Sequence, residues 1–138
     1  MSLLFVDCEF NGFGGQLMSM AVVSDCGKEW YEVLPLPEVI EPWVKNNVVD
    51  VMEKEPISEF EFRMSLFAFL EQFENPTICA DWYTDIAHFF SAFAGPDHSQ
   101  SRGFACKAEL RLIEEYDSKI PHNALSDARA IKEVWLNG

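Results

Sequence analysis

The stretch LLFVDC, residues 3–8, is a short run of apolar and β-favouring residues that ends beside an acid. Such a run is typical of a buried strand. Two further runs, Leu17 to Ser24 and Glu29 to Leu34, follow it, and the turn-forming sequences NGFGG and DCG separate the three. The chain therefore begins with a predicted three-stranded antiparallel meander. NGFGG lacks the Lys-Ser/Thr ending of a phosphate-binding loop, so we interpret it as a tight turn.

Helices alternate with strands in the rest of the chain. Ser58, with Glu61 three residues later, predicts the N-cap of a helix whose apolar residues recur at helical spacing. The other predicted elements are a short helix at Trp43–Asn47, a strand at Thr77–Ala80, a helix at Asp85–Ala94, a loop at 97–101, a strand at Gly103–Cys106, a helix at Ala108–Tyr116 and a helix at Ala124–Leu136. We expect one α/β domain, residues 1–138, with a mixed sheet flanked by helices.

The composition is that of a globular chain without a membrane span. Nearly half of the 138 residues are apolar, and no apolar run approaches the roughly 20 residues that a span requires. The four cysteines are widely spaced and form no pair or Cys/His cluster typical of a metal site. With only six residues before Asp7, we expect no signal peptide and a cytoplasmic location.

The net charge of −13 limits the function classes. Taken alone, it argues against a protein that binds a long phosphate backbone, because the usual positive surface is missing. A nucleic-acid function would need another way to bring two anions together, and metal ions can do this locally.

Asp7 and Glu9 flank Cys8 in VDCEF, at the end of the first predicted strand. Side chains alternate along a strand, so both acids point to one face, roughly 6.6 Å apart along it. Two buried like charges repel each other, and a divalent cation such as Mg²⁺ or Mn²⁺ would relieve the cost. The alternative is that the strand ends before Glu9 and water solvates both acids.

Asp85 follows the fourth predicted strand and begins a helix in ADWYTDIAHFF. An acid in the first helical turn also complements the helix dipole, which is the simpler reading. Asp81, four residues earlier, is a second candidate for the acid at the end of this strand.

The last acidic motif is HNALSDARA, residues 122–130. Asn123 is a natural N-cap, so His122 should lie just outside the helix while Asp127 points inward from its first turn. A carboxylate on the inward stripe that includes Ile131 is costly unless it is paired or bound to metal. The alternative for His122 is a surface residue at the helix end.

Together these motifs resemble the DEDD exonucleases with a histidine in the third motif, within the ribonuclease H-like superfamily. VDCEF, ADWYTDIAHFF and HNALSDARA occur in the family's order, and the resemblance spans almost the whole chain. DCEFNGFGGQLMSMAVVS and PWVKNNV are similar to a compact bacterial and phage branch of 3′–5′ exoribonucleases. The resemblance implies a ribonuclease H-like fold and a catalytic set made of Asp7, Glu9, Asp85, Asp127 and His122.

The resemblance also implies a mechanism. The four acids would hold two Mg²⁺ or Mn²⁺ ions, and His122 would act as general base. The enzyme would hydrolyse single-stranded RNA, or DNA, from its 3′ end and release nucleoside 5′-monophosphates. The preference for RNA follows from the resemblance alone, and the oligomeric state stays open between monomer and homodimer.

Substrate contacts are expected from residues beside the motifs. We assign this role to Phe10, Asn11, Trp82, Tyr83 and Arg129. Phe10 and Asn11 stand where many relatives carry small residues or threonine, so their contacts to the terminal nucleotide do not carry over directly. Aromatic rings can stack on bases, although core packing is the ordinary role of an aromatic residue. Basic residues near the third motif can contact phosphates, although most such residues are simply solvated; these are Arg102, Lys107, Arg111, Lys119 and Arg129.

Two other function classes remain. An acidic mimic of nucleic acid would use the −13 as decoy charge, and it predicts acids in surface rows. A catalytically silent relative would keep the fold as a binding module, and it predicts that one of the motif residues is missing. All the motif residues are present here.

Overall fold

The computed structural model describes residues 2–95 and 101–138 of the chain. Its elements are β1 (Leu3–Phe10), β2 (Leu17–Ser24), β3 (Glu29–Val33), α1 (Pro42–Asn47), the 3₁₀ turn η1 (Val49–Val51), α2 (Glu59–Leu70), β4 (Thr77–Ala80), α3 (Tyr83–Ala94), β5 (Lys107–Leu110) and α4 (Ala124–Asn137). The five strands form one mixed sheet in the order β3-β2-β1-β4-β5. The predicted α/β class with antiparallel and parallel strands is confirmed.

Strand β1 is central and pairs on both sides. It runs antiparallel to β2 over Leu4–Phe10 and parallel to β4 over Leu3–Phe5 only. Because β4 ends at Ala80, the far half of β1 has no strand on that side. Glu9 still pairs with Ser19, so the prediction that β1 ends at Cys8 was too short.

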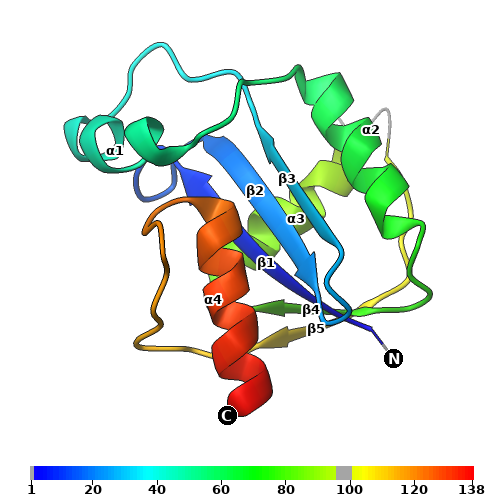
Figure 1. The fold of residues 1–138 in the computed structure, drawn as a ribbon. Helices are drawn as coiled ribbons and strands as arrows, with labels where there is room; N and C mark the ends of the chain where they lie inside the picture. Colours follow the sequence, from blue (N-terminus) through cyan, green and yellow to red (C-terminus); the bar gives the residue numbers. More distant parts are fainter. Residues whose placement is uncertain (1, 96–100) are drawn as a thin grey trace.

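The helices cover both faces of the sheet (Figure 1). α4 lies on one face, where Ala124 and Ala128 pack against Ala21 and Val23 of β2. α2 and α3 pack against the other face, with Phe62 and Phe89 in the largest apolar cluster. α1 and η1 form a separate small cluster at one end of the sheet.

Local signals explain where the helices begin. Ser58 caps α2 by accepting a hydrogen bond from the Glu61 N–H (3.1 Å). Asn123 caps α4 in the same way through the Ser126 N–H (3.0 Å), as predicted. No helix in the described ranges is both long and apolar enough for a membrane span.

Two predictions between β4 and α4 were wrong. The fifth strand is Lys107–Leu110 rather than Gly103–Cys106, and Ala108–Tyr116 is not a helix. Lys107 to Leu110 pair instead with the free edge of β4, which satisfies backbone groups that would otherwise be buried unpaired. This tertiary pairing outweighs the helix propensity of the segment. Apart from Ser101, the predicted loop at 97–101 lies outside the described residues.

We expect the two phenylalanines Phe62 and Phe60 of α2 to differ sharply in their effect on stability. Phe62 is 2% exposed and Phe60 is 63% exposed. Phe62→Ala should lower the free energy of unfolding by about 3–5 kcal/mol, because it leaves a cavity in the core. Phe60→Ala should change it by about 0.5 kcal/mol at most. Urea denaturation of both variants measures this, and equal losses would contradict the assigned core.

Candidate functional site

The acidic motifs converge at the end of β1. Asp7 pairs with Ala21, which packs against α4, so the side chains of Asp7 and Glu9 face that helix. Asp7 is buried and Glu9 is half-buried. The alternative of two solvated acids beyond the strand end is therefore wrong.

Asp85 joins the cluster from the other side of β1. Its Oδ1 accepts a hydrogen bond from the backbone N–H of Cys8 (3.0 Å), a donor that has no strand partner because β4 has ended. Asp85 is 4% exposed although it lies in the first turn of α3. The helix dipole alone therefore does not account for Asp85, because its side chain is buried and bonded to β1.

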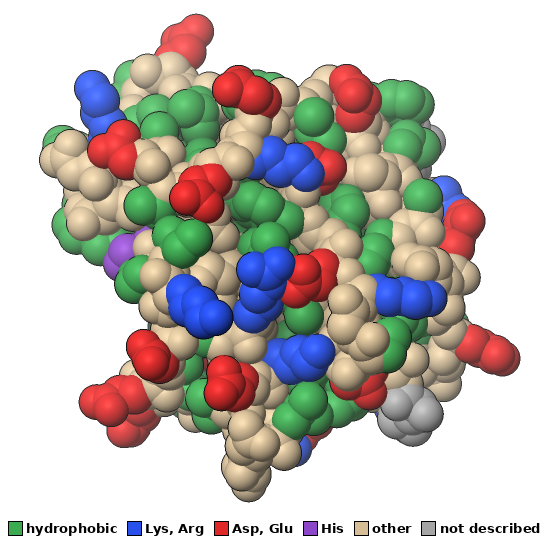
Figure 2. Space-filling model, in the orientation of Figure 1, with side chains coloured by type: hydrophobic (Ala, Val, Ile, Leu, Met, Phe, Trp, Pro, Cys, Tyr) green, Lys and Arg blue, Asp and Glu red, His purple; other side chains and the backbone are tan. Residues whose placement is uncertain are grey.

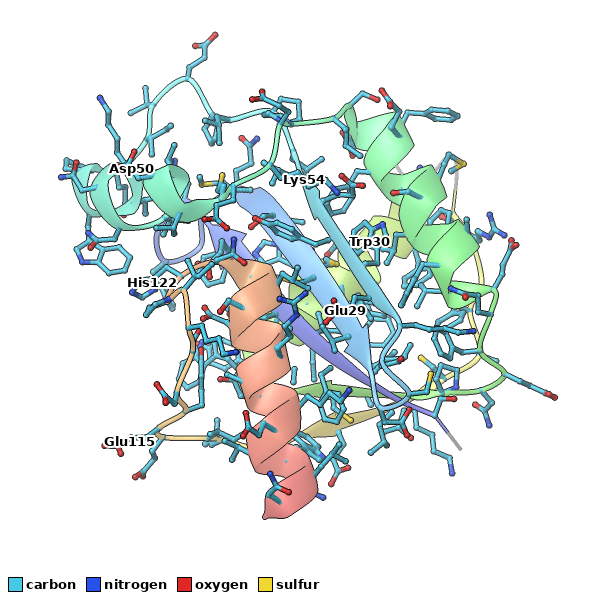
Figure 3. The ribbon with its side chains drawn as sticks, viewed as in Figure 1. Glu29, Trp30, Asp50, Lys54, Glu115 and His122 are labelled. Atoms are coloured by element: carbon cyan, nitrogen blue, oxygen red, sulfur yellow. The ribbon has the colours of Figure 1, made fainter. Side chains whose placement is uncertain are left out.

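Asp127 and His122 approach from the start of α4. Asp127 is 5% exposed, and its Oδ2 accepts a hydrogen bond from the backbone N–H of His122 (3.2 Å). His122 lies before the N-cap with φ of 70°, an uncommon conformation for a residue other than glycine. Figure 3 shows His122 beside the start of α4, as predicted.

The side chains fall into two groups of three. One ligand atom from each of Glu9, His122 and Asp127 lies within 4.8 Å of the other two, and the same holds for Asp7, Asp81 and Asp85. The structure thus brings together all five residues predicted for catalysis. It adds Asp81, whose role the sequence left open.

Burial raises the pKa of these carboxyl groups. For Asp7 the burial effect is largest, and repulsion from Asp85 and Glu9 adds to it. Burial and then the charge of Asp127 raise the pKa of Glu9. Burial and then the charge of Asp81 raise the pKa of Asp85 to about 8. These acids are costly to ionise together in this space.

The donor set fits a hard divalent cation. Oδ2 of Asp7 and Oδ1 of Asp127 are buried and have no hydrogen-bond partner within the described part of the chain. Buried carboxylate oxygens without donors are rare and call for a compensating charge. Carboxylate oxygens are the ligands that suit Mg²⁺ or Mn²⁺. Asp7, Glu9, Asp85 and Asp127 could hold such ions, and Asp81 could assist.

The predicted substrate residues lie in different places. Trp82 and Tyr83 are exposed beside Asp81, with ring centroids 4.8 Å apart, so they border the acids. Phe10 packs on the ring of His88 (5.3 Å). The Asn11 side chain donates to Val39 O (2.8 Å), which gives it a structural role. Substrate contacts by these residues stay predictions.

Arg129 is held away from the cluster. Its guanidinium forms two hydrogen bonds of 2.7 Å with Glu29, and Figure 3 shows Glu29 on the opposite side of α4 from His122. Basic side chains gather over the middle of the molecular face that carries α4 (Figure 2). Two others of the five basic residues also pair with acids, Arg102 with Glu71 and Arg111 with Glu109.

Sequence reasoning missed two residues beside the acids. Trp43 of α1 contacts the His122 ring (5.0 Å between centroids), and the sequence carries no signal that links them. Tyr116 has a raised pKa, through burial and then the charges of Asp7 and Asp127, so its hydroxyl lies near the cluster. It belongs to the segment wrongly predicted as helix.

No protein-family model matches the sequence, and no curated protein is significantly similar to it.

Replacing Asp85 with Asn should flatten the pH dependence of stability without metal. The Asp85 pKa is raised from 3.8 to about 8, because the fold favours the protonated carboxyl group. The contribution of this group to the free energy of unfolding is therefore complete below about pH 4 and is lost as the pH rises towards about 8. In EDTA, the free energy of unfolding of the wild type should fall relative to Asp85→Asn over that range, on the order of 1 kcal/mol per pH unit. Urea denaturation across the range measures it, and parallel curves would refute it.

Proposed function

We propose that this protein is a metal-dependent 3′–5′ exonuclease with a ribonuclease H-like fold, acting on single-stranded RNA or DNA. The observation that carries the proposal is the convergence of Asp7, Glu9, Asp85, Asp127 and His122, from three separate motifs, at one end of β1. These are the residues that the resemblance to DEDD exonucleases assigns to catalysis. The preference for RNA rests on that resemblance alone.

The four acids would hold two Mg²⁺ or Mn²⁺ ions, with Asp81 close enough to assist. When bound, the ions would act as Lewis acids: they would place positive charge against the phosphate oxygens and lower the pKa of bound water towards neutral pH. Their charge would also relieve the repulsion between the buried acids. Without them, this cluster would repel a phosphodiester.

His122 would move a proton in the proposed reaction. A ring nitrogen of His122 lies within 4.8 Å of carboxylate oxygens of Glu9 and Asp127. As general base, it would take a proton from the water that attacks phosphorus. The bond from phosphorus to the 3′ oxygen of the preceding nucleotide would then break, and that oxygen would take up a proton from solvent to become the new 3′ hydroxyl. The terminal nucleotide leaves as a nucleoside 5′-monophosphate.

The acidic surface favours a short contact with substrate. A net charge of −13 gives little attraction for a long phosphate backbone, so we infer that the enzyme holds only a few nucleotides at the 3′ end. The exposed rings of Trp82 and Tyr83 beside Asp81 would stack on unpaired bases. Stacking of this kind requires single-stranded substrate and little positive charge.

The decisive test is degradation of 5′-labelled single-stranded RNA and DNA of one sequence, with Mg²⁺, Mn²⁺ or EDTA. We expect a ladder that shortens from the 3′ end and disappears in EDTA. Asp127→Asn should lower the rate at least about 100-fold, because it removes a ligand rather than a supporting residue. Glu133→Gln, an exposed acid of the same helix, is the matched control and should keep the wild-type rate.

The outcome of this assay separates the alternatives. Retained activity in Asp127→Asn would contradict the assigned site. No cleavage by a wild-type protein that still binds Mn²⁺ would favour a silent binding module. No cleavage and no metal binding would favour the acidic mimic.

Metal binding should also stabilise the fold. At about 100 times the dissociation constant, Mn²⁺ should add about 2.7 kcal/mol and raise the unfolding temperature on the order of 8 °C. Asp7→Asn should abolish the rise, because Asp7 is buried and its carboxylate lies within 4.8 Å of ligand atoms of Asp81 and Asp85. Thermal unfolding followed by circular dichroism measures this, with Glu133→Gln as control. An equal rise in Asp7→Asn would place the metal elsewhere.

A further inference from the structure

Trp43, in the first turn of α1, contacts His122 although the two lie 79 positions apart. The indole and imidazole rings meet edge to face, with centroids 5.0 Å apart and planes at 80°. This is a favoured geometry for aromatic pairs. Trp43 is nevertheless 56% exposed, so its burial contributes little to the core. Within the described residues, the ring contact of Trp43 is with His122.

The segment that carries Trp43 is hydrogen-bonded to the turn that follows β1. The Asn11 side chain donates to Val39 O (2.8 Å) and accepts from the Glu41 N–H (3.0 Å), immediately before α1 begins. Gly12 adopts φ of 76°, a conformation that favours glycine, and lies against the Glu41 carboxylate. The turn after Glu9 therefore fixes the start of α1.

The end of the same segment is hydrogen-bonded to the N-cap residue of α4. The Asn123 side-chain amide donates to the carbonyl oxygens of Val51 (2.8 Å) and Met52 (3.3 Å), while its oxygen caps α4. The residue next to His122 is thus tied to the end of η1. With both ends held, α1 presents Trp43 at a fixed position relative to His122.

His122 needs such support. Its backbone is held at φ of 70° by the cap and by the hydrogen bond from its N–H to Asp127. That bond fixes the main chain but leaves the rotation of the imidazole about its side-chain bonds undetermined. The edge-to-face contact with the Trp43 indole restricts this rotation.

We propose that Trp43 is a positioning residue that holds the His122 imidazole toward Glu9 and Asp127. This role rests on the proposed function of His122 as general base. Trp43 acts through His122, so its removal should lower the turnover number and leave substrate binding largely unchanged. The expected loss is on the order of ten-fold, the factor equivalent to one favourable aromatic pair.

The test compares Trp43→Ala and Trp43→Phe, each with and without His122→Ala, in steady-state kinetics on a single-stranded oligonucleotide. Trp43→Ala should lower kcat about ten-fold with KM changed less than about two-fold. Trp43→Phe keeps a ring and should restore most of kcat. In the His122→Ala background, Trp43→Ala should cause no further loss, because the group that it positions is absent.

Three results would overturn this role: an effect on KM alone, an undiminished loss in the His122→Ala background, or an unchanged kcat in Trp43→Ala of an active protein. A purely structural role would also lower the unfolding temperature of Trp43→Ala and persist without His122. A wild-type protein that cleaves neither RNA nor DNA would instead overturn the proposed function, and this role with it.

Proton NMR gives a readout independent of activity. The imidazole resonance of His122 is assigned as the one lost in His122→Ala, and the indole ring current should shift it in the wild type. Trp43→Ala should remove the shift and broaden the range of ring orientations. An identical resonance position in wild type and Trp43→Ala would show that the rings do not hold each other, and would overturn the inference whatever the kinetics.

Discussion

Repulsion between buried carboxyl groups at the end of β1 is the constraint on which the rest of this structure depends. Asp7, Glu9, Asp81, Asp85 and Asp127 each have a raised pKa, with burial as the largest cause. A fold does not keep such a cluster without support from its surroundings. Here the support is the apolar packing of α3 and α4 against opposite faces of the sheet.

The lengths of two neighbouring strands make room for the cluster. β4 stops at Ala80, whereas β1 continues to Phe10, so the Cys8 N–H is free to bind Asp85. A longer β4 would pair with that donor and displace the first turn of α3. The part of β1 that extends beyond β4 therefore leaves space beside it, and side chains from three motifs meet there.

Much of this arrangement could be predicted from the sequence, because its signals are local. Alternation along a strand put Asp7 and Glu9 on one face, and the Asn123 cap put His122 outside α4. The strand at Lys107–Leu110 escaped prediction because its residues are exposed and only the edge of β4 makes them a strand. The positions of Trp43 and Tyr116 depend on tertiary contacts, which no local pattern encodes.

The parallel pairing of β1 with β4 has a consequence for synthesis of the chain. It joins Leu3 to Thr77, and the cluster is complete only when Asp127 arrives with α4. During translation, the β1–β3 meander can form early, since its contacts are local. Until α4 emerges, however, the nascent meander exposes the apolar face around Ala21 and Val23. The packing of α4 therefore covers this apolar face in the same step that brings Asp127 to the other acids.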